Sequence, residues 1–166
     1  PHLISENRFQ SLSVVGDVMF DLYLEQLPAI RKSGILRELS LLPKQFVFVT
    51  LHRPVNVDDP SKLDLILSEL EKVAKVLPVV FPIHPRTKAN IKKFGLSSYL
   101  QRMKILEPIA YPDTQRLISE ASIIFTDSGG VQKESYFAGT PCLTIREKTE
   151  WVETLKTGRN ALISNV

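Results

Sequence analysis

The chain has 166 residues, of which 43% are hydrophobic and 23% charged, and it contains a single cysteine. This length suffices for one domain with a hydrophobic core of its own. One cysteine excludes a disulfide framework and a cysteine-cluster zinc site, so a reducing cytoplasm is the expected compartment. No apolar run approaches the ~20 residues of a membrane-spanning helix, so we expect no membrane segment and no signal peptide.

The charge balance says little, but the distribution of the basic residues gives no sign of nucleic-acid binding. Twenty-one lysines and arginines against 18 aspartates and glutamates leave a formal net charge of +3. The basic residues are scattered, for example at Arg31, Lys92 and Arg102, instead of forming one stripe. Proteins that bind nucleic acids usually carry a clustered basic patch and a recognisable motif. We therefore expect a solvated surface of mixed charge and no nucleic-acid partner.

Short apolar runs of β type alternate with longer helical patterns along the chain. Helices are expected at 19–33, from 60 to the proline at 78, at 87–94, from 113 to about 121, after 130 to about 139, and at 150–156. Strands are expected at 46–49, 79–83, 103–106, 122–126, 141–145 and 161–163. This alternation predicts an α/β fold: a Rossmann-like parallel sheet with helices on both faces and right-handed crossovers.

Particular residues mark the ends of these elements. Asp59 and Pro60 are typical of an N-cap and a first helical position. Asp113 is expected to cap the helix that follows the third strand, and Gly95 to end the helix before that strand. Pro82 indicates an edge strand or a bend. The Rossmann-like domain is expected over 41–166, with 1–40 as a linker and docking helix.

Charged, imidazole and hydroxyl side chains follow the ends of several predicted strands. They are His52 and Arg53 after the first strand, His84 and Arg86 after the second, Asp127 and Ser128 after the fourth, and Arg146 after the fifth. Ligands of open α/β sheets bind beyond the carboxyl ends of the strands. A single histidine after a strand is more often structural, but the gathering of these groups at one edge favours a crevice for an anion.

The sharpest local signal is the D-S-G-G segment at 127–130. A strand followed by Ser128, Gly129 and Gly130 and then a helix presents unpaired amides and a positive dipole end to a phosphate. Glu134 lies four residues beyond Gly130 on the same helix face, where a carboxylate can accept hydrogen bonds from a ribose diol. The alternative is a plain turn in which Asp127 or Ser128 only caps the helix.

The two histidines also raise the possibility of a metal site. His52 and His84 fall on different loops without a carboxylate at ligand spacing, so we expect no metal. His52 with Arg53 instead suits a diphosphate, because arginine forks onto two phosphate oxygens and histidine donates a proton or a hydrogen bond. Cys142 lies within a predicted strand and is expected to be an inert core thiol.

Four segments carry a combined signature: T-L-H-R-P at 50–54, P-I-H-P-R at 82–86, T-D-S-G-G-V-Q-K-E at 126–134 and G-T-P at 139–141. Together with T-E-W at 149–151, they resemble the non-hydrolysing UDP-N-acetylglucosamine 2-epimerases from about residue 16 to the end. The resemblance implies one half of a two-domain glycosyltransferase-B-like fold that binds UDP-sugar, and a cytoplasmic, homodimeric parent without a cofactor. This chain would be the carboxyl-terminal, UDP-binding half, inactive alone because the acid and base carboxylates belong to the amino-terminal half.

The resemblance also implies roles for single residues. His52 matches the family's catalytic histidine near the glycosidic phosphate, Ser128, Gly129 and Gly130 match its diphosphate cradle, and Glu134 matches its ribose ligand. Arg53, His84 and Arg86 stand in matching substrate-binding motifs.

Three positions depart from the family's pattern and leave the sugar open. They are Val55, Thr114 and Trp151. Relatives that act on a diacetamido uronic acid nucleotide remain an alternative substrate class. The donor domain of a glycosyltransferase and a regulatory module that binds a nucleotide without chemistry remain alternative functions.

Overall fold

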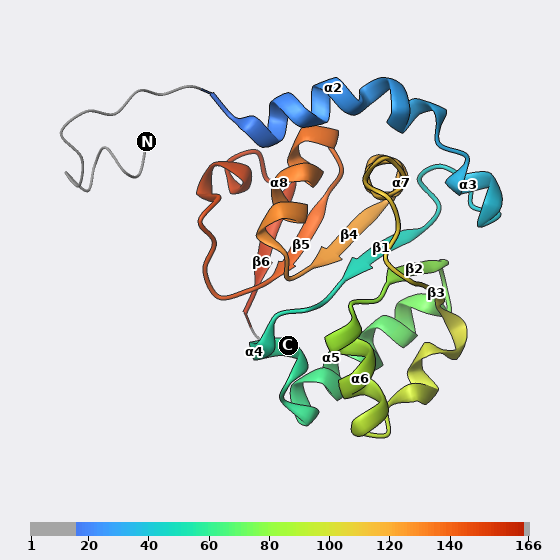
Figure 1. Cartoon of the computed structure of the whole chain (residues 1–166). Coiled ribbons are helices and arrows are strands. Elements are labelled where there is room, and N and C mark those ends of the chain that lie inside the picture. Colours follow the sequence, from blue (N-terminus) through green and yellow to red (C-terminus); the bar gives the residue numbers. More distant parts are fainter. Residues whose placement is uncertain (1–15, 165–166) are drawn as a thin grey trace, which may run out of the picture.

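In the computed structural model, which describes residues 16–164, one six-stranded sheet is flanked by helices (Figure 1). The strands are β1 (Val47–Thr50), β2 (Val79–Pro82), β3 (Lys104–Leu106), β4 (Ile123–Thr126), β5 (Cys142–Ile145) and β6 (Asn160–Ile163). The helices are α2 (Val18–Lys32), α3 (Ile35–Glu38), α4 (Pro54–Val57), α5 (Pro60–Ala74), α6 (Pro85–Lys93), η1 (Ser97–Arg102), α7 (Tyr111–Glu120), α8 (Gly129–Ala138) and η2 (Val152–Leu155). The α2 and β-strand predictions are therefore confirmed.

All neighbouring strands run parallel, in the order β3-β2-β1-β4-β5-β6. After β1 the chain adds β2 and β3 on one side of β1, and it then crosses to the other side to add β4, β5 and β6. The strand order therefore reverses between β1 and β4. In open α/β sheets such a reversal opens a crevice at the carboxyl ends of the two strands. The structure confirms the predicted Rossmann-like α/β class.

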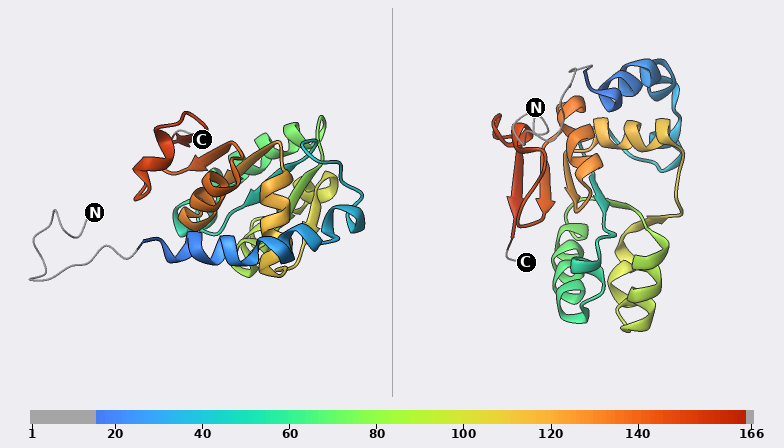
Figure 2. Two further views of the ribbon diagram at one scale, coloured as in Figure 1. Left: turned by 90° about the horizontal axis from the view of Figure 1, so that it is seen from above. Right: turned by 60° about the vertical axis from the view of Figure 1, so that its left-hand side comes forward.

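Helices cover both faces of the sheet, because alternate residues of the buried strands face opposite layers. Val47 and Val49 belong to a core with the buried side of α5 and with Ile91 of α6. Phe46 and Phe48 belong to a second core with α7 and α3. Figure 2 shows α5 and α6 on one side of the sheet and α2, α7 and α8 on the other.

The predicted cap of α5 is confirmed. The Asp59 carboxylate accepts hydrogen bonds from the backbone N–H groups of Ser61 and Lys62, and Pro60 is the first helical residue. The helix ends at Ala74, four residues before the proline that was expected to stop it. Between β1 and this cap lie His52, Arg53 and the short helix α4.

Two predicted helix starts are wrong. The helix expected from residue 87 begins at Pro85, because His84 is its N-cap and accepts a hydrogen bond from the Arg86 amide. Asp113 does not cap α7, which begins at Tyr111. Its carboxylate instead accepts a 2.5 Å hydrogen bond from the Ser33 hydroxyl and ties α7 to the end of α2.

Two further expectations need correction. Pro82 is not on an edge strand, since β2 lies between β1 and β3. It is the last residue of β2, and the following Ile83 amide donates to the Leu106 carbonyl, so the missing proline N–H removes little from the ladder. The helix expected at 150–156 is a short 3-10 turn, Val152–Leu155.

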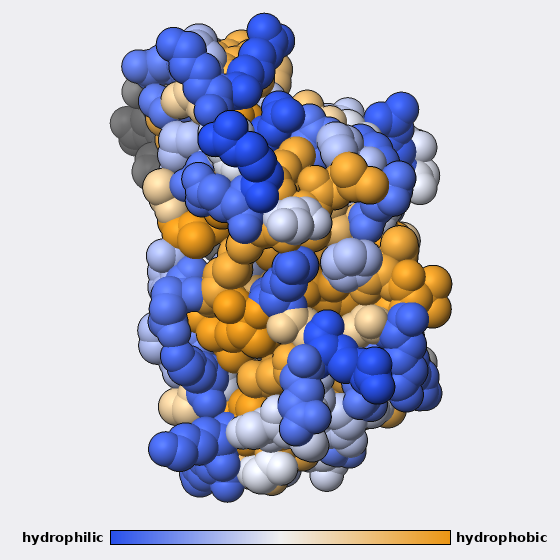
Figure 3. Space-filling model, turned by 90° about the vertical axis from the view of Figure 1, so that its right-hand side faces the viewer, coloured by the Kyte–Doolittle hydropathy of each residue, from blue (hydrophilic) through white to orange (hydrophobic). Residues whose placement is uncertain are grey.

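Helix α2 packs against the domain. Asp17, its N-cap, forms a 2.6 Å ion pair with Lys133 of α8, and the Phe20 and Phe137 rings lie 4.9 Å apart. The chain before residue 16, part of the predicted linker, lies outside the described residues. No helix within 16–164 is long and apolar enough to cross a membrane. Apolar side chains form a band between hydrophilic regions on the face at the right of Figure 1 (Figure 3).

Candidate functional site

A cleft of about 270 Å³ lies at the carboxyl ends of β1, β2 and β4. Its lining comes from three loops and the first turns of α7 and α8. The lining residues are Thr50, Leu51, His52, Pro82, Ile83, His84, Pro108, Ile109, Thr114, Ser128 and Val131. The cleft thus opens where the reversed strand order predicts a crevice. Of the predicted site residues, His52, His84 and Ser128 line it directly.

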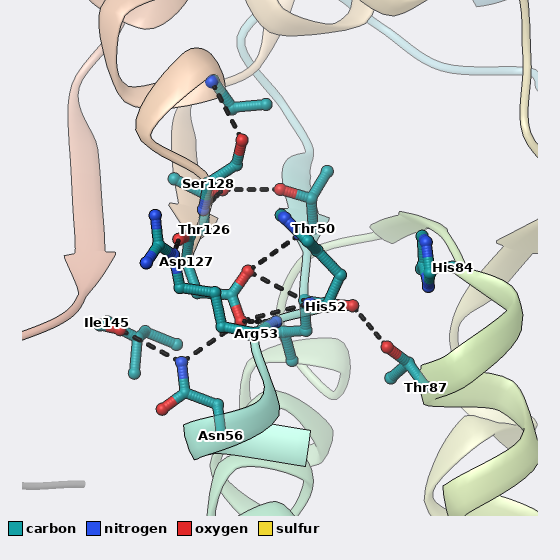
Figure 4. A network of polar contacts seen from close by, with 12 residues as sticks. Thr50, His52, Arg53, Asn56, His84, Thr87, Thr126, Asp127, Ser128 and Ile145 are labelled. Atoms are coloured by element: carbon teal, nitrogen blue, oxygen red, sulfur yellow. Dashed lines mark hydrogen bonds and ion pairs between the residues drawn. The ribbon is translucent and has the colours of Figure 1, made fainter. Parts of the chain in front are cut away.

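Asp127 is the centre of the polar network beside the cleft (Figure 4). Its side chain is fully buried and accepts hydrogen bonds from the His52 and Arg53 amides and from the Asn56 side chain. Burial opposes ionisation, but the hydrogen bonds, led by that of His52, leave the pKa of Asp127 below its ordinary value. A buried carboxylate therefore joins the loop after β1 to the end of β4.

The tautomer of His52 follows from its contact with Asp127. His52 Nδ1 lies 3.1 Å from an oxygen of this carboxylate, which accepts but cannot donate. Nδ1 therefore carries a hydrogen, and Nε2 is the ring nitrogen left for other partners. The imidazole side chain is 40% exposed and lines the cleft. His52 can thus present Nε2 to a bound group, as a base when neutral or as an acid when protonated.

His84 has the opposite arrangement. Its Nδ1 accepts a 3.2 Å hydrogen bond from the Arg86 amide, so the neutral ring carries its hydrogen on Nε2. The His52 and His84 rings lie on the same cleft with their centroids 5.7 Å apart (Figure 4). The pair therefore offers one ring nitrogen for proton transfer and one N–H for donation to an anion.

The amino-terminal end of α8 forms the third part of the site. Ser128 is the N-cap, and its hydroxyl accepts a hydrogen bond from the Val131 amide at 3.3 Å. Gly129 and Gly130 follow as the first helical residues. The first amides of a helix have no partner within it and carry the positive end of the helix dipole. The structure thus places the predicted Ser128, Gly129 and Gly130 at the start of α8.

The two glycines have different surroundings, which gives a prediction. A Cβ on Gly129 would displace Glu150 Oε1, the end of a flexible side chain, and would lie 3.1 Å from Arg146 Nη1 and 3.2 Å from the rigid Trp151 ring at Nε1. A Cβ on Gly130 would find its nearest neighbour, a Ser128 oxygen, at 3.6 Å. We expect Gly129→Ala to lower the free energy of unfolding by about 1–3 kcal/mol through overpacking. Gly130→Ala, the matched control, should be neutral or stabilising because alanine favours the helix. Urea unfolding measures both, and equal stabilities would contradict this account.

Five predicted site residues do not line the main cleft: Gly129 and Gly130, which begin α8, and Arg53, Arg86 and Glu134. Arg53 donates from Nε to the Asp127 carbonyl at 2.7 Å and lines a neighbouring groove of about 180 Å³ together with Arg146. Arg86 forms a two-pronged ion pair with Asp58 on the exposed surface. Its guanidinium is thus already engaged, and the structure does not bring it to the cleft.

Glu134 lies in the second turn of α8, one turn beyond Val131. It does not line the cleft, although Val131 on the same helix face does. Burial raises the pKa of the Glu134 carboxyl, and the neighbouring Gln115 partly opposes this. The carboxyl group therefore lies on the side of α8 that packs against α7.

Sequence reasoning missed the role of the central residue of the site. The sequence places Asp127 among the polar residues that follow the strands and offers it as a possible helix cap, whereas in the structure Ser128 is the cap and Asp127 holds the loop after β1. Asn56, which donates to Asp127 and to the Ile145 carbonyl, was not singled out. One sequence feature could have indicated this role of Asp127. It is an acidic residue directly after a buried strand, and the strand beside it in the sheet is also followed by a polar loop.

The described residues show no metal-binding cluster of three or more histidine, cysteine or acidic side chains. Cys142 is buried in β5. Burial raises the pKa of its thiol, which keeps it in the unreactive protonated form. The polar side chains that line the cleft are the imidazoles of His52 and His84 and the hydroxyls of Thr50, Thr114 and Ser128.

The fold and the cleft place the chain among Rossmann-like α/β domains in which a helix begins at the strand reversal. The model of the UDP-N-acetylglucosamine 2-epimerase family matches residues 1–166. The chain belongs to this family, and the resemblance carried by its motifs is confirmed.

Two curated relatives differ in the sugar that their names specify. A UDP-N-acetylglucosamine 2-epimerase homolog of Methanococcus maripaludis is 40% identical over 157 residues, which cover 91% of this chain and 43% of the relative. The UDP-2,3-diacetamido-2,3-dideoxy-D-glucuronate 2-epimerase of Pseudomonas aeruginosa is 38% identical, over 95% of this chain and 43% of the relative. The chain thus spans less than half the length of these relatives.

Solved structures also match nearly the whole of this chain over less than half of their own length. The UDP-GlcNAc 2-epimerase of Methanocaldococcus jannaschii, in complex with UDP-GlcNAc and UDP, matches with a TM-score of 0.86 and 34% identity, over 97% of this chain and 46% of that one. An Escherichia coli heptosyltransferase with an ADP-sugar analogue shares only the fold, at 9% identity and a TM-score of 0.51, over 73% of this chain and 37% of that one.

Proposed function

We propose that this chain is the UDP-binding half of a UDP-N-acetylglucosamine 2-epimerase, which interconverts UDP-GlcNAc and UDP-ManNAc. The observation that carries the proposal is the cleft between His52 and the amino-terminal end of α8, in a chain of this family. The whole activity requires a longer protein, because the chain spans less than half of its relatives.

The cleft suits a nucleoside diphosphate. The first amides of α8 and the Ser128 hydroxyl would bind the diphosphate, with the His84 N–H as a further donor. Arg53, fixed by the Asp127 carbonyl, adds positive charge beside the helix end. Arg86 would contribute only after leaving Asp58, so we assign it no direct contact. Glu134 would accept hydrogen bonds from the ribose hydroxyls.

The proposed reaction removes UDP and adds it back. A base takes the proton from C2 of the sugar, the C1–O bond breaks, and UDP leaves with the bonding electrons, which gives a 2-acetamidoglucal. Fixed donors at the growing negative charge of UDP lower this barrier. His52 Nε2, when protonated, would donate to the departing phosphate oxygen. The intermediate is then protonated at C2 on the other face, and UDP returns to C1.

The experiment that tests the function follows hydrogen exchange. In deuterium oxide, the full-length protein should introduce deuterium at C2 of UDP-GlcNAc, whereas these 166 residues alone should introduce none, because the acid and base carboxylates are expected in the other half. Calorimetry with the 166-residue chain should still detect UDP binding. Exchange by the chain alone, or a chain that folds but does not bind UDP, would contradict the proposal.

Replacing Glu134 by alanine is expected to weaken UDP binding. The carboxylate would lose its hydrogen bonds to the ribose diol, so binding should weaken by about 1.5–3 kcal/mol, the range for hydrogen bonds to a charged group. This loss corresponds to an affinity lower by about 10- to 150-fold. Glu153→Ala is the control, because Glu153 is exposed and belongs to η2, not to α8. Equal UDP affinities of Glu134→Ala and wild type would remove this role.

A second substrate has its own support. The Pseudomonas aeruginosa relative, named for UDP-2,3-diacetamido-2,3-dideoxy-D-glucuronate, is 38% identical, nearly as similar as the first relative. Deuterium exchange with both nucleotide sugars distinguishes the two, since the true substrate should exchange faster at equal concentration. We further propose a cytoplasmic, homodimeric parent without a resident cofactor that serves polysaccharide biosynthesis. Light scattering of the full-length protein tests the dimer.

A further inference from the structure

An ion pair lies at the first turn of α8, beside the cleft. Arg146, the residue after β5, donates from Nη2 to a Glu150 oxygen at 2.7 Å. The other terminal nitrogen of this guanidinium, Nη1, is buried and has no hydrogen-bond partner within residues 16–164. Buried donors are usually paired, so a donor without an acceptor at this place points to a missing partner.

Three polar atoms meet where Gly129 has no side chain. The point where a Cβ of Gly129 would lie is surrounded by Glu150 Oε1 as the nearest atom, Arg146 Nη1 at 3.1 Å and Trp151 Nε1 at 3.2 Å. Guanidinium and indole nitrogens can only donate hydrogen bonds, and a carboxylate can only accept them. Gly129 is the first residue of α8, whose first amides carry the positive end of the helix dipole. A negatively charged oxygen therefore already lies among donors at this helix end.

The donors of this group are held in place, whereas the acid is not. The side chain of Arg146 is 13% exposed and that of Glu150 is 48% exposed. The Trp151 ring packs against Lys133, whose Nζ lies 4.0 Å from the ring centroid and 2.6 Å from an Asp17 oxygen. An ion pair with so exposed an acid contributes little free energy. The carboxylate can therefore turn away and leave its place to another anion.

A second arginine adjoins the same place. Arg53 and Arg146 line one groove of about 180 Å³, and Arg53 Nε donates to the carbonyl of Asp127, two residues before the start of α8. The pKa of Glu150 is lowered first by its hydrogen bond with Arg146 and further by the charge of Arg53. Two guanidiniums thus act on one carboxylate, in an arrangement that suits a doubly charged phosphate better.

We propose that Arg146 binds the β-phosphate of the nucleotide, and that Glu150 occupies this place on the guanidinium until the diphosphate displaces it. This inference rests on the proposed function and adds two residues to it. The main cleft lies at the ends of β1, β2 and β4, and Arg146 follows β5, on the opposite side of β4. With the nucleoside in the main cleft, Arg146 meets the phosphate farther from the ribose.

This contact would also serve the proposed reaction. A phosphate oxygen in place of the carboxylate gives the Nη1 donor of Arg146 the acceptor that it lacks. The β-phosphate carries the oxygen that leaves C1 of the sugar, and a fixed guanidinium stabilises the negative charge that grows there.

The two partners of the ion pair should change UDP binding in opposite directions. Arg146→Met removes the guanidinium and should weaken UDP binding by about tenfold or more, the value of hydrogen bonds to a charged group. Glu150→Gln keeps the size of the side chain but removes the competing charge. It should strengthen UDP binding by about two- to fivefold, the value of an exposed ion pair that no longer has to be broken. Calorimetry with the 166-residue chain measures both.

UMP distinguishes the two phosphates, because it lacks the β-phosphate. Both variants should change UMP binding by less than about twofold. Arg159→Met is the matched control for the arginine, since Arg159 Nη1 donates to the Gly139 carbonyl at the opposite end of α8. Glu153→Gln, at an exposed residue of η2, is the control for the acid. Both controls should bind UDP as the wild type does.

Several outcomes would overturn the inference. Weaker UDP binding in both variants would show that the ion pair only supports the loop after β5. Unchanged UDP binding in Arg146→Met, or an equal loss for UDP and UMP, would show that Arg146 does not contact the β-phosphate. An unchanged UDP affinity of Glu150→Gln would show that this carboxylate does not compete. If the wild-type chain folds but does not bind UDP, the proposed function itself fails.

Arg146→Lys covers the case in which Arg146→Met does not fold. Lysine keeps the positive charge and can pair with Glu150, but it lacks the planar fork that binds two oxygens at once. We expect the free energy of unfolding to stay near that of the wild type, while UDP binding weakens by about fivefold or more and UMP binding is unchanged. An Arg146→Lys variant with the UDP affinity of the wild type would equally contradict the proposal.

Discussion

Replacing Asp127 by alanine is expected to lower the free energy of unfolding by about 3–5 kcal/mol, the range for breaking a buried charged pair. The buried carboxylate accepts from the amides of His52 and Arg53 and from the Asn56 side chain, and it pairs with the His52 ring. Alanine would leave these donors without an acceptor. The loop after β1 would then lose its attachment to the end of β4.

Urea unfolding measures this loss. Asp59→Ala is the matched control, because Asp59 is an exposed cap whose removal typically costs about 1 kcal/mol. The difference between wild type and Asp127→Ala should also depend on pH. The pKa of Asp127 is lowered in the folded state, so its stabilisation is present above the unfolded value, near 3.8, and is lost as the pH falls through the folded value. A loss no larger than that of Asp59→Ala would contradict the central role of Asp127.

The network around Asp127 also shows which features the sequence alone could predict. Buried strands such as Val47–Thr50 and the cap at Asp59 follow from local patterns, because a run of apolar residues or an Asp-Pro pair determines its own conformation. The fold class also predicted that His52, His84 and Ser128 meet at one edge of the sheet, since parallel strands have their carboxyl ends on the same side. These predictions required no knowledge of particular long-range contacts.

The remaining features depend on contacts between distant segments. Asp113 has the residue type of a cap, but Ser33, 80 residues earlier, engages its carboxylate. Arg86 follows a strand as a phosphate ligand would, yet Asp58 lies close enough to pair with it. Gln115 carries no local signal, because its burial becomes apparent only when α7 meets α2 and α8. Sequence patterns place residues on an edge or a face, and the packing decides their partners.

Replacing His52 by alanine is expected to have the largest effect on catalysis in the complete enzyme proposed above. Asp127 holds Nδ1 at 3.1 Å and thereby leaves Nε2 for the phosphate of the departing UDP. Loss of a positioned acid typically lowers a rate by about 10²–10⁴-fold. We expect this loss in the rate of deuterium entry at C2 of UDP-GlcNAc, with a much smaller change in UDP affinity, because the helix end and its cap remain.

His84→Asn provides the comparison on the opposite side of the cleft. Asparagine can replace the cap of α6, so the variant removes the ring N–H while α6 keeps its start. It should weaken UDP binding by about tenfold or less, the value of one hydrogen bond, and slow exchange far less than His52→Ala does. If the two variants slowed exchange equally, with matching losses of UDP affinity, both histidines would be binding residues and His52 would not be the acid.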